Sequence, residues 1–177
     1  MTIEENSKFS SGQITVVSRA AAEAEDLVSD YYKLSATQMR QLNYDIKTVA
    51  ELEPHEVVIE HFAQIVHYRT QKQNSFLTTE AEDFYKICLQ DHSILSEVRR
   101  HPEIELYPFL LYIICHELIH VVRFRRFKQR FSVPDEQRQA EEIRVHGITH
   151  EILARRNIAG MQPVFEFYEN WRKAGAL

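Results

Sequence analysis

Glycine is nearly absent from the middle of this chain of 177 residues. Only four glycines occur, and none lies between Gln13 and His146. A β protein rich in hairpins uses glycine to reach positive φ in its tight turns, so this stretch argues against that class. The five prolines each lie near the start of a helix-forming run, where a missing N–H costs little. The sequence therefore predicts an all-α protein, folded as a single-domain helical bundle.

The predicted helices cover residues 18–34, 36–50, 55–73, 79–100, 106–130, 134–158 and 163–174. Thr79 and Glu82 have the spacing of a capping box, which favours a helix start there. The segment Ile14–Val17 is strand-like, and we expect it to be a docked extended arm. Residues 1–12 are polar and are expected to form a disordered N-terminal tail, followed by one helical domain over 13–177.

The composition excludes several classes of partner. With 26 acidic and 21 basic residues, the net charge is −5, which gives no global electrostatic reason to bind nucleic acid or an anionic membrane. Cys88 and Cys115 lie in apolar stretches, as buried thiols do in a reducing compartment. The first residues are polar and lack the apolar core of a signal peptide. We therefore expect a cytoplasmic protein.

One segment, from Leu106 to Val122, is apolar almost all round, which predicts a helix in the centre of the bundle. It does not fit a membrane span, because its uncharged run is about half the length that a bilayer requires. Glu117 would also lie well inside such a span. The basic run from Arg123 to Arg130 that follows is expected to be a solvated helix end that complements the helix dipole.

The central motif is His116-Glu117-Leu118-Ile119-His120, an HExxH pattern on this apolar helix. Residues four apart share a helix face, so the two imidazoles can bind one metal ion while Glu117 reaches the space beside it. A carboxylate among apolar neighbours also needs a cation or a strong donor. The motif therefore predicts a metal centre in which Glu117 is catalytic.

These residues resemble the motif of the zincin metallopeptidases, which has uncharged residues around its two histidines. In the gluzincin branch, a second helix carries a glutamate ligand, usually followed one turn later by an aspartate that orients a histidine. The resemblance implies Zn²⁺ held by His116, His120 and a glutamate, with Glu117 as general base acting on a peptide or another amide. Zincins also carry a sheet whose edge strand lines the substrate cleft, and the sequence predicts no such sheet.

The predicted third ligand is Glu142, because Glu142, His146 and His150 recur every four residues along one stripe of the second helix. His146 occupies the position of the gluzincin aspartate. It is therefore either a fourth metal ligand or a partner that supports a ligand. Glu141 lies outside this stripe, and its replacement is expected to have little effect on metal binding.

Two other functions compete with a zinc hydrolase. A ferritin-like non-haem diiron protein would use Glu117-x-x-His120 as one of its Glu-x-x-His pairs, although a second such pair is missing. Further iron ligands would come from Glu56 or Glu60, Glu142, His146 and His61, the last expected to point to the core. The third possibility is a non-enzymatic helical interaction domain. The expected partner is a small-molecule or peptide substrate, with no nucleic acid and no membrane.

Overall fold

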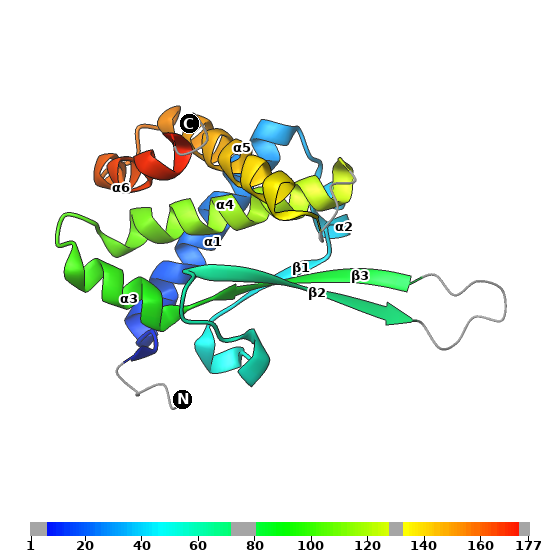
Figure 1. Ribbon diagram of the computed structural model, residues 1–177, viewed down its shortest axis with the longest axis horizontal. Coiled ribbons are helices and arrows are strands. Elements are labelled where there is room, and N and C mark those ends of the chain that lie inside the picture. Colours follow the sequence, from blue (N-terminus) through cyan, green and yellow to red (C-terminus); the bar gives the residue numbers. More distant parts are fainter. Residues whose placement is uncertain (1–6, 72–80, 128–132, 174–177) are drawn as a thin grey trace.

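The computed structural model describes residues 7–71, 81–127 and 133–173. The helices are α1 (Ser11–Tyr32), α2 (Ala36–Gln41), α3 (Asp91–Arg100), α4 (Leu106–Arg126), α5 (Asp135–Ala154) and α6 (Met161–Lys173) (Figure 1). The strands are β1 (Tyr44–Lys47), β2 (Ala63–Gln71) and β3 (Ala81–Leu89), with 3-10 turns at Val49–Glu51 and Pro54–Glu56. The fold is mixed α/β, so the prediction of an all-α helical bundle is wrong.

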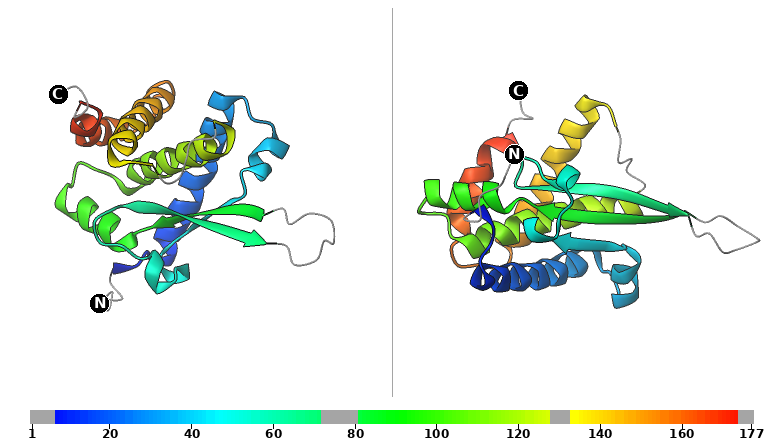
Figure 2. Two further views of the ribbon diagram at one scale, coloured as in Figure 1. Left: turned by 45° about the vertical axis from the view of Figure 1, so that its right-hand side comes forward. Right: turned by 90° about the horizontal axis from the view of Figure 1, so that it is seen from below.

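The three strands form one sheet in the order β1-β3-β2. β1 runs parallel to β3, whereas β2 is antiparallel to it, with Ile65 opposite Ile87. One face of the sheet packs against the helices, as the stacking of Tyr85 on Phe124 of α4 shows. The views agree that α4 lies between the sheet and the pair α5 and α6 (Figure 2). The helix that carries the HExxH motif is therefore the central layer of the fold.

The sheet takes up parts of three of the predicted helices. The range 36–50 contains α2 followed by β1. The range 55–73 contains a 3-10 turn and β2, and the range 79–100 contains β3 followed by α3. The absence of glycine misled the prediction, because β2 and β3 pair in antiparallel fashion although no glycine occurs in either strand or in the sequence between them. Glu82 of the expected capping box lies in β3, and Thr79 lies outside the described residues.

The N-terminal segment is helical earlier than expected. α1 begins at Ser11 behind a capping box made by Ser10 and Gln13, so Ile14–Val17 is helix rather than an extended arm. Phe9 is buried, and its N–H donates to Asp91 Oδ2 at 2.9 Å. The described part of the range 1–12 thus packs on the domain, while residues 1–6 lie outside the described residues.

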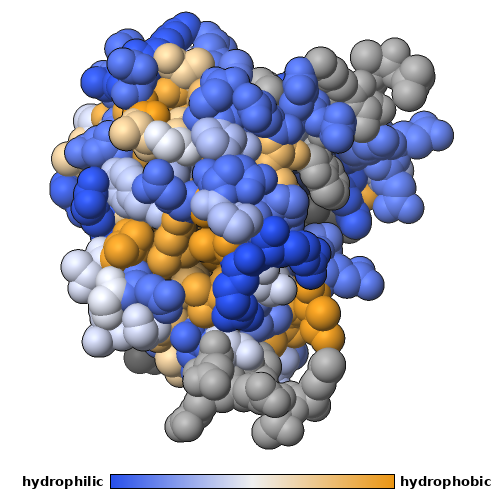
Figure 3. Space-filling model, turned by 90° about the vertical axis from the view of Figure 1, so that its left-hand side faces the viewer, coloured by the Kyte–Doolittle hydropathy of each residue, from blue (hydrophilic) through white to orange (hydrophobic). Residues whose placement is uncertain are grey.

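α4 is buried along most of its length, as its apolar sequence predicts. Within the described residues it is the helix with the length and hydropathy of a possible membrane span, and 83% of that window is buried inside the protein. A buried core helix passes the same test. Hydrophobic surface also appears between hydrophilic groups at the end of the molecule where α3 and α6 lie (Figure 3).

Candidate metal centre

The candidate site lies between α4 and α5. Contacts between the two helices run in opposite directions along the chain, since Tyr112 meets His146 while Arg123 meets Glu141. The helices are therefore antiparallel, and the stripe on α5 faces the HExxH motif. His116 and His120, one turn apart on α4, are each only 7% exposed. The local helical period places both imidazoles on the same side.

Both imidazoles converge on one carboxylate. His116 Nε2 lies 3.1 Å from Glu142 Oε2, and His120 Nε2 lies 3.0 Å from Glu142 Oε1. The two Nε2 atoms are 3.2 Å apart. Two nitrogens from α4 and two carboxylate oxygens from α5 thus meet in one small space, and each oxygen faces a different histidine.

His146 adds a third imidazole. Its Nε2 lies 4.0 Å from Glu142 Oε2, and the potential ligand atoms of His116, Glu142 and His146 all lie within 4.8 Å of one another. The structure therefore brings together the four side chains that the sequence proposed as ligands. His150, at the next position of the stripe, instead packs its ring against Phe165, with the centroids 4.4 Å apart.

Tyr112 is part of the site and was missed by the sequence analysis. Its hydroxyl lies 2.9 Å from His146 Nδ1, and its ring stacks on Tyr168 of α6 with centroids 4.1 Å apart. Because Nδ1 of His146 is engaged by Tyr112, Nε2 is the nitrogen that faces Glu142. Tyr112 lies one helical turn before His116, and this i, i+4 spacing was the signal that could have identified it.

The second ring nitrogen of His116 is a buried polar atom without a hydrogen-bond partner among the described residues. Buried polar groups are normally paired, so such an atom is uncommon. The ring is held by its neighbours instead: its centroid lies 4.2 Å from that of His146 and 4.8 Å from that of His120. Imidazoles and carboxylates are side chains that bind divalent transition metals, and the potential ligand atoms of His116, Glu142 and His146 are close enough together to hold one ion.

The electrostatics fit an ionised Glu142. Burial alone would raise the pKa of its carboxyl, but hydrogen bonds from His116 and His120 outweigh burial and hold the pKa well below its usual range. Burial disfavours the charged form of His120, yet its hydrogen bond to Glu142 and the charge of Glu117 raise its pKa. The pocket thus stabilises positive charge beside Glu142, which is the role a bound cation would take over.

Glu117 lies beside this network rather than in it. It follows His116 on α4, about 100° further around the helix, and has no hydrogen-bond partner in the described part of the chain. Its side chain is partly exposed. Burial raises the pKa of its carboxyl, against the opposing effect of His116 and His120. A carboxyl in this position is available to exchange a proton.

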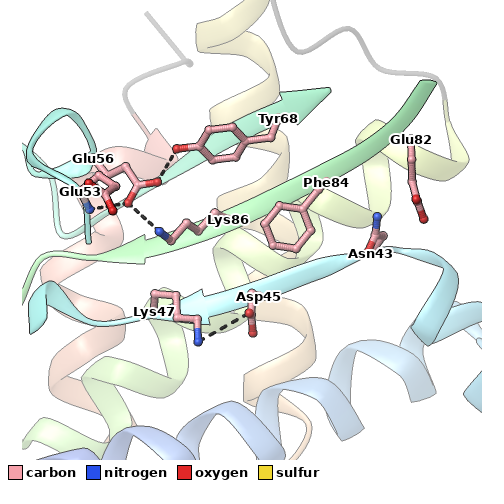
Figure 4. A pocket seen from close by; sticks show the side chains of 9 residues that line it. All are labelled: Asn43, Asp45, Lys47, Glu53, Glu56, Tyr68, Glu82, Phe84 and Lys86. Atoms are coloured by element: carbon pink, nitrogen blue, oxygen red, sulfur yellow. Dashed lines mark hydrogen bonds and ion pairs between the residues drawn. The ribbon is translucent and has the colours of Figure 1, made fainter. Parts of the chain in front are cut away.

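The proposed iron ligands outside α4 and α5 lie elsewhere. Glu56 is buried in a 3-10 turn, accepts a hydrogen bond from Tyr68 and lies 2.6 Å from Lys86 Nζ (Figure 4). These contacts lower the pKa of Glu56 to about 2, although burial alone would raise it. Glu60 is exposed, and so is His61, so the expectation that His61 points to the core is wrong. The helix predicted over 55–73 would have been needed to direct them toward α4.

The basic run at the end of α4 is not a solvated helix end. Arg123 is buried and forms an ion pair with Glu141 of α5. Arg125 donates to the carbonyl oxygens of Leu42 and Asp83, which ties α4 to the sheet. The later part of the run, at 128–130, lies outside the described residues. The arginines therefore serve mainly as tethers between elements.

The fold and the site together describe a small α/β protein with an HExxH helix facing a glutamate on the next helix. Comparison of the chain with family models, with curated proteins and with solved structures finds no match.

Proposed function

We propose that the protein is a zinc-dependent hydrolase of the zincin type that acts on a peptide or another amide. The observation that carries the proposal is the convergence of His116 and His120 on the two oxygens of Glu142, with Glu117 adjacent but outside that network. Two imidazoles and one carboxylate are a donor set found in catalytic zinc sites, which leave one position for water or substrate.

His116, His120 and Glu142 would hold the metal. His146 would support the site rather than bind the metal, because its Nε2 lies 4.0 Å from Glu142 Oε2, whereas the Nε2 atoms of His116 and His120 lie 3.1 and 3.0 Å from that carboxylate. Partners of this kind orient the ligands and are typical of zinc sites. When bound, Zn²⁺ supplies Lewis-acid polarisation of a carbonyl and lowers the pKa of water.

Glu117 would act as the general base. A base works best when its pKa lies near the operating pH, and burial moves the pKa of Glu117 in that direction. Its carboxylate would accept the proton of the attacking water and pass it to the leaving amine. Glu117 lies next to His116 in sequence and has no competing hydrogen-bond partner among the described residues, so its carboxylate is free for this transfer.

The sheet supports a peptide as the class of substrate. β2 is an edge strand, since the order within the described sheet is β1-β3-β2, and it lies beside α4. An extended peptide can add to such an edge through main-chain hydrogen bonds. Zincins carry a sheet whose edge strand lines the substrate cleft. The sheet of this protein, which the sequence did not predict, therefore supports the resemblance.

The alternatives find less support. The diiron proposal needed a helical bundle and ligands from residues 56–61, but Glu56 is paired with Lys86 on the side of the sheet away from Tyr85 and α4. The proposal of a helical interaction domain treated the histidines and Glu142 as structural partners of one another. That proposal leaves Glu117 without a role, although its carboxyl interacts electrostatically with His116, His120 and Glu142 and has no hydrogen-bond partner among the described residues.

The test is metal analysis of protein purified without added metal, together with hydrolysis of a mixture of fluorogenic peptides. We expect about one zinc per chain, and hydrolysis that a chelator abolishes and added Zn²⁺ restores. About two irons per chain would favour the diiron alternative. The proposal would be contradicted if the wild-type protein is purified without metal and takes up no Zn²⁺ when it is added.

Individual variants on α5 should separate ligand from supporting partner. Glu142→Ala is expected to empty the site, because it removes the carboxylate that both motif histidines face. His146→Ala should leave the site occupied, with zinc affinity reduced by about 10–100-fold, as changes around a ligand typically do. Equilibrium zinc titration at one pH measures both effects.

His150→Ala is the matched control, because His150 lies on the same stripe of α5 but packs against Phe165. It should retain the wild-type affinity. If His146→Ala empties the site as completely as Glu142→Ala, His146 is a ligand, and the comparison with the gluzincin pattern fails at that position.

A further inference from the structure

A buried ion pair joins α4 to α5 directly beside the candidate ligands. Arg123 donates from Nε to Glu141 Oε1, and its Nη2 donates to Glu141 Oε2 at 3.2 Å. Both residues are 9% exposed. Arg123 lies one turn after His120, and Glu141 directly precedes Glu142. This two-point contact therefore connects the helix of the motif histidines to the helix of the third ligand at the level of the site.

Within the part of the chain that the structure describes, few other contacts hold the start of α5. Residues 135–140, its first turns, are all exposed, and Glu141 is the first buried residue of the helix. The next buried residues are Val145 and His146, one turn further on. Glu142 itself has a side chain that is 46% exposed, so packing alone holds it weakly. Among the described residues, the ion pair is thus the contact between buried side chains of α4 and α5 that lies nearest to Glu142 along α5.

The geometry of the pair suits this task. A planar guanidinium that binds both oxygens of a carboxylate defines orientation as well as distance. A buried ion pair adds little net stability compared with apolar side chains, so its value lies more in specifying one arrangement. A change of one residue in the helix register would rotate Glu142 by about 100° away from the two histidines.

We infer that Arg123 and Glu141 are positioning residues, which fix the rotation of α5 so that Glu142 reaches His116 and His120. The inference depends on the proposed metal site, and it gives the pair no contact with the metal. It also revises the expectation from the sequence that replacing Glu141 has little effect. Glu141 lies outside the ligand stripe, but it acts on the neighbouring ligand through Arg123.

The test measures zinc affinity by competition with a chromophoric chelator in the full chain. Glu141→Gln removes the charge of one partner, and Arg123→Lys keeps the charge of the other but loses its two-point geometry. Each variant should bind zinc about 10–100-fold more weakly. The variant that carries both changes should bind zinc as tightly as the more strongly affected single variant, because the two residues act through one contact.

Two control variants separate positioning from general effects. Glu151→Gln breaks the exposed pair of Glu151 with Arg155 on the same helix and should leave the affinity unchanged. Ile152→Val loosens the core beneath α5 and should lower the melting temperature without changing the affinity. In the Co²⁺-substituted protein, Glu141→Gln should alter the visible absorption spectrum, which reports coordination geometry, whereas both controls should match the wild type.

The outcomes distinguish this inference from the proposed function. If the wild-type chain binds zinc and Glu141→Gln binds it equally well with the same Co²⁺ spectrum, the inference is overturned and the metal site stands. Full retention of affinity in Arg123→Lys would likewise overturn the two-point role of the guanidinium. If the wild-type chain binds no zinc, the proposed function fails and the inference fails with it.

Discussion

Replacement of both His116 and His120 by alanine should reduce the zinc content of the purified protein from about one ion per chain to nearly none. The two Nε2 atoms lie 3.2 Å apart and face the same carboxylate, so a metal ion bound by Glu142 would also contact both nitrogens. Of the three proposed ligands only Glu142 would remain, with His146 beside it, and this pair should not hold zinc against competing chelators. Mass spectrometry of metal content in the folded variant measures the loss.

The control for this result is the double variant His92→Ala and His150→Ala, which removes two histidines that lie outside the cluster. His92 faces the carbonyl oxygen of Val58, and His150 packs on Phe165. Zinc content should stay at the wild-type level. Full occupancy in the variant lacking His116 and His120 would place the metal site elsewhere in the chain.

Glu117→Gln should retain zinc and lose turnover by about 10²–10⁴-fold, the usual contribution of a general base. The amide keeps the size of the carboxyl but cannot accept a proton, and Glu117 is outside the network formed by His116, His120 and Glu142. The measurement is metal content and peptide hydrolysis in the same preparation.

Glu60→Gln provides the matched control, since Glu60 is an exposed glutamate that only the diiron alternative would use as a ligand. It should keep both metal and activity. If Glu117→Gln loses metal together with turnover, Glu117 is a ligand, and the assignment of a zincin-like base is wrong. Loss of iron in Glu60→Gln would support the diiron site.

The candidate site could be located from the sequence because its geometry is mostly local. On a helix, spacing alone determines which side chains share a face. The HExxH spacing therefore placed His116 and His120 together, and the four-residue period of α5 placed Glu142 and His146 together. The choice of Glu142 over Glu141 also followed from this period, and in the structure Glu141 turns toward Arg123 instead.

The fold could not be predicted in the same way. All three strands were assigned to helices, because the scarcity of glycine was taken as evidence against hairpins, whereas β2 and β3 pair in antiparallel fashion with no glycine between them in the sequence. Their pairing, with His67 opposite Tyr85, depends on contacts between segments distant along the chain. Periodicity within one segment carries no information about such partners.

The sequence by itself determined a buried apolar helix with two histidines on one face and a second helix with a glutamate and a histidine on one stripe. The tertiary structure decided that these two faces meet, through the antiparallel packing of α4 and α5 and the pair of Arg123 with Glu141. It also decided that Tyr112 engages His146 and that β2, an edge strand of the described sheet, contacts α4. The physical reason is that helical periodicity orders side chains within one element, whereas the relative rotation of two elements depends on packing between residues distant in the chain.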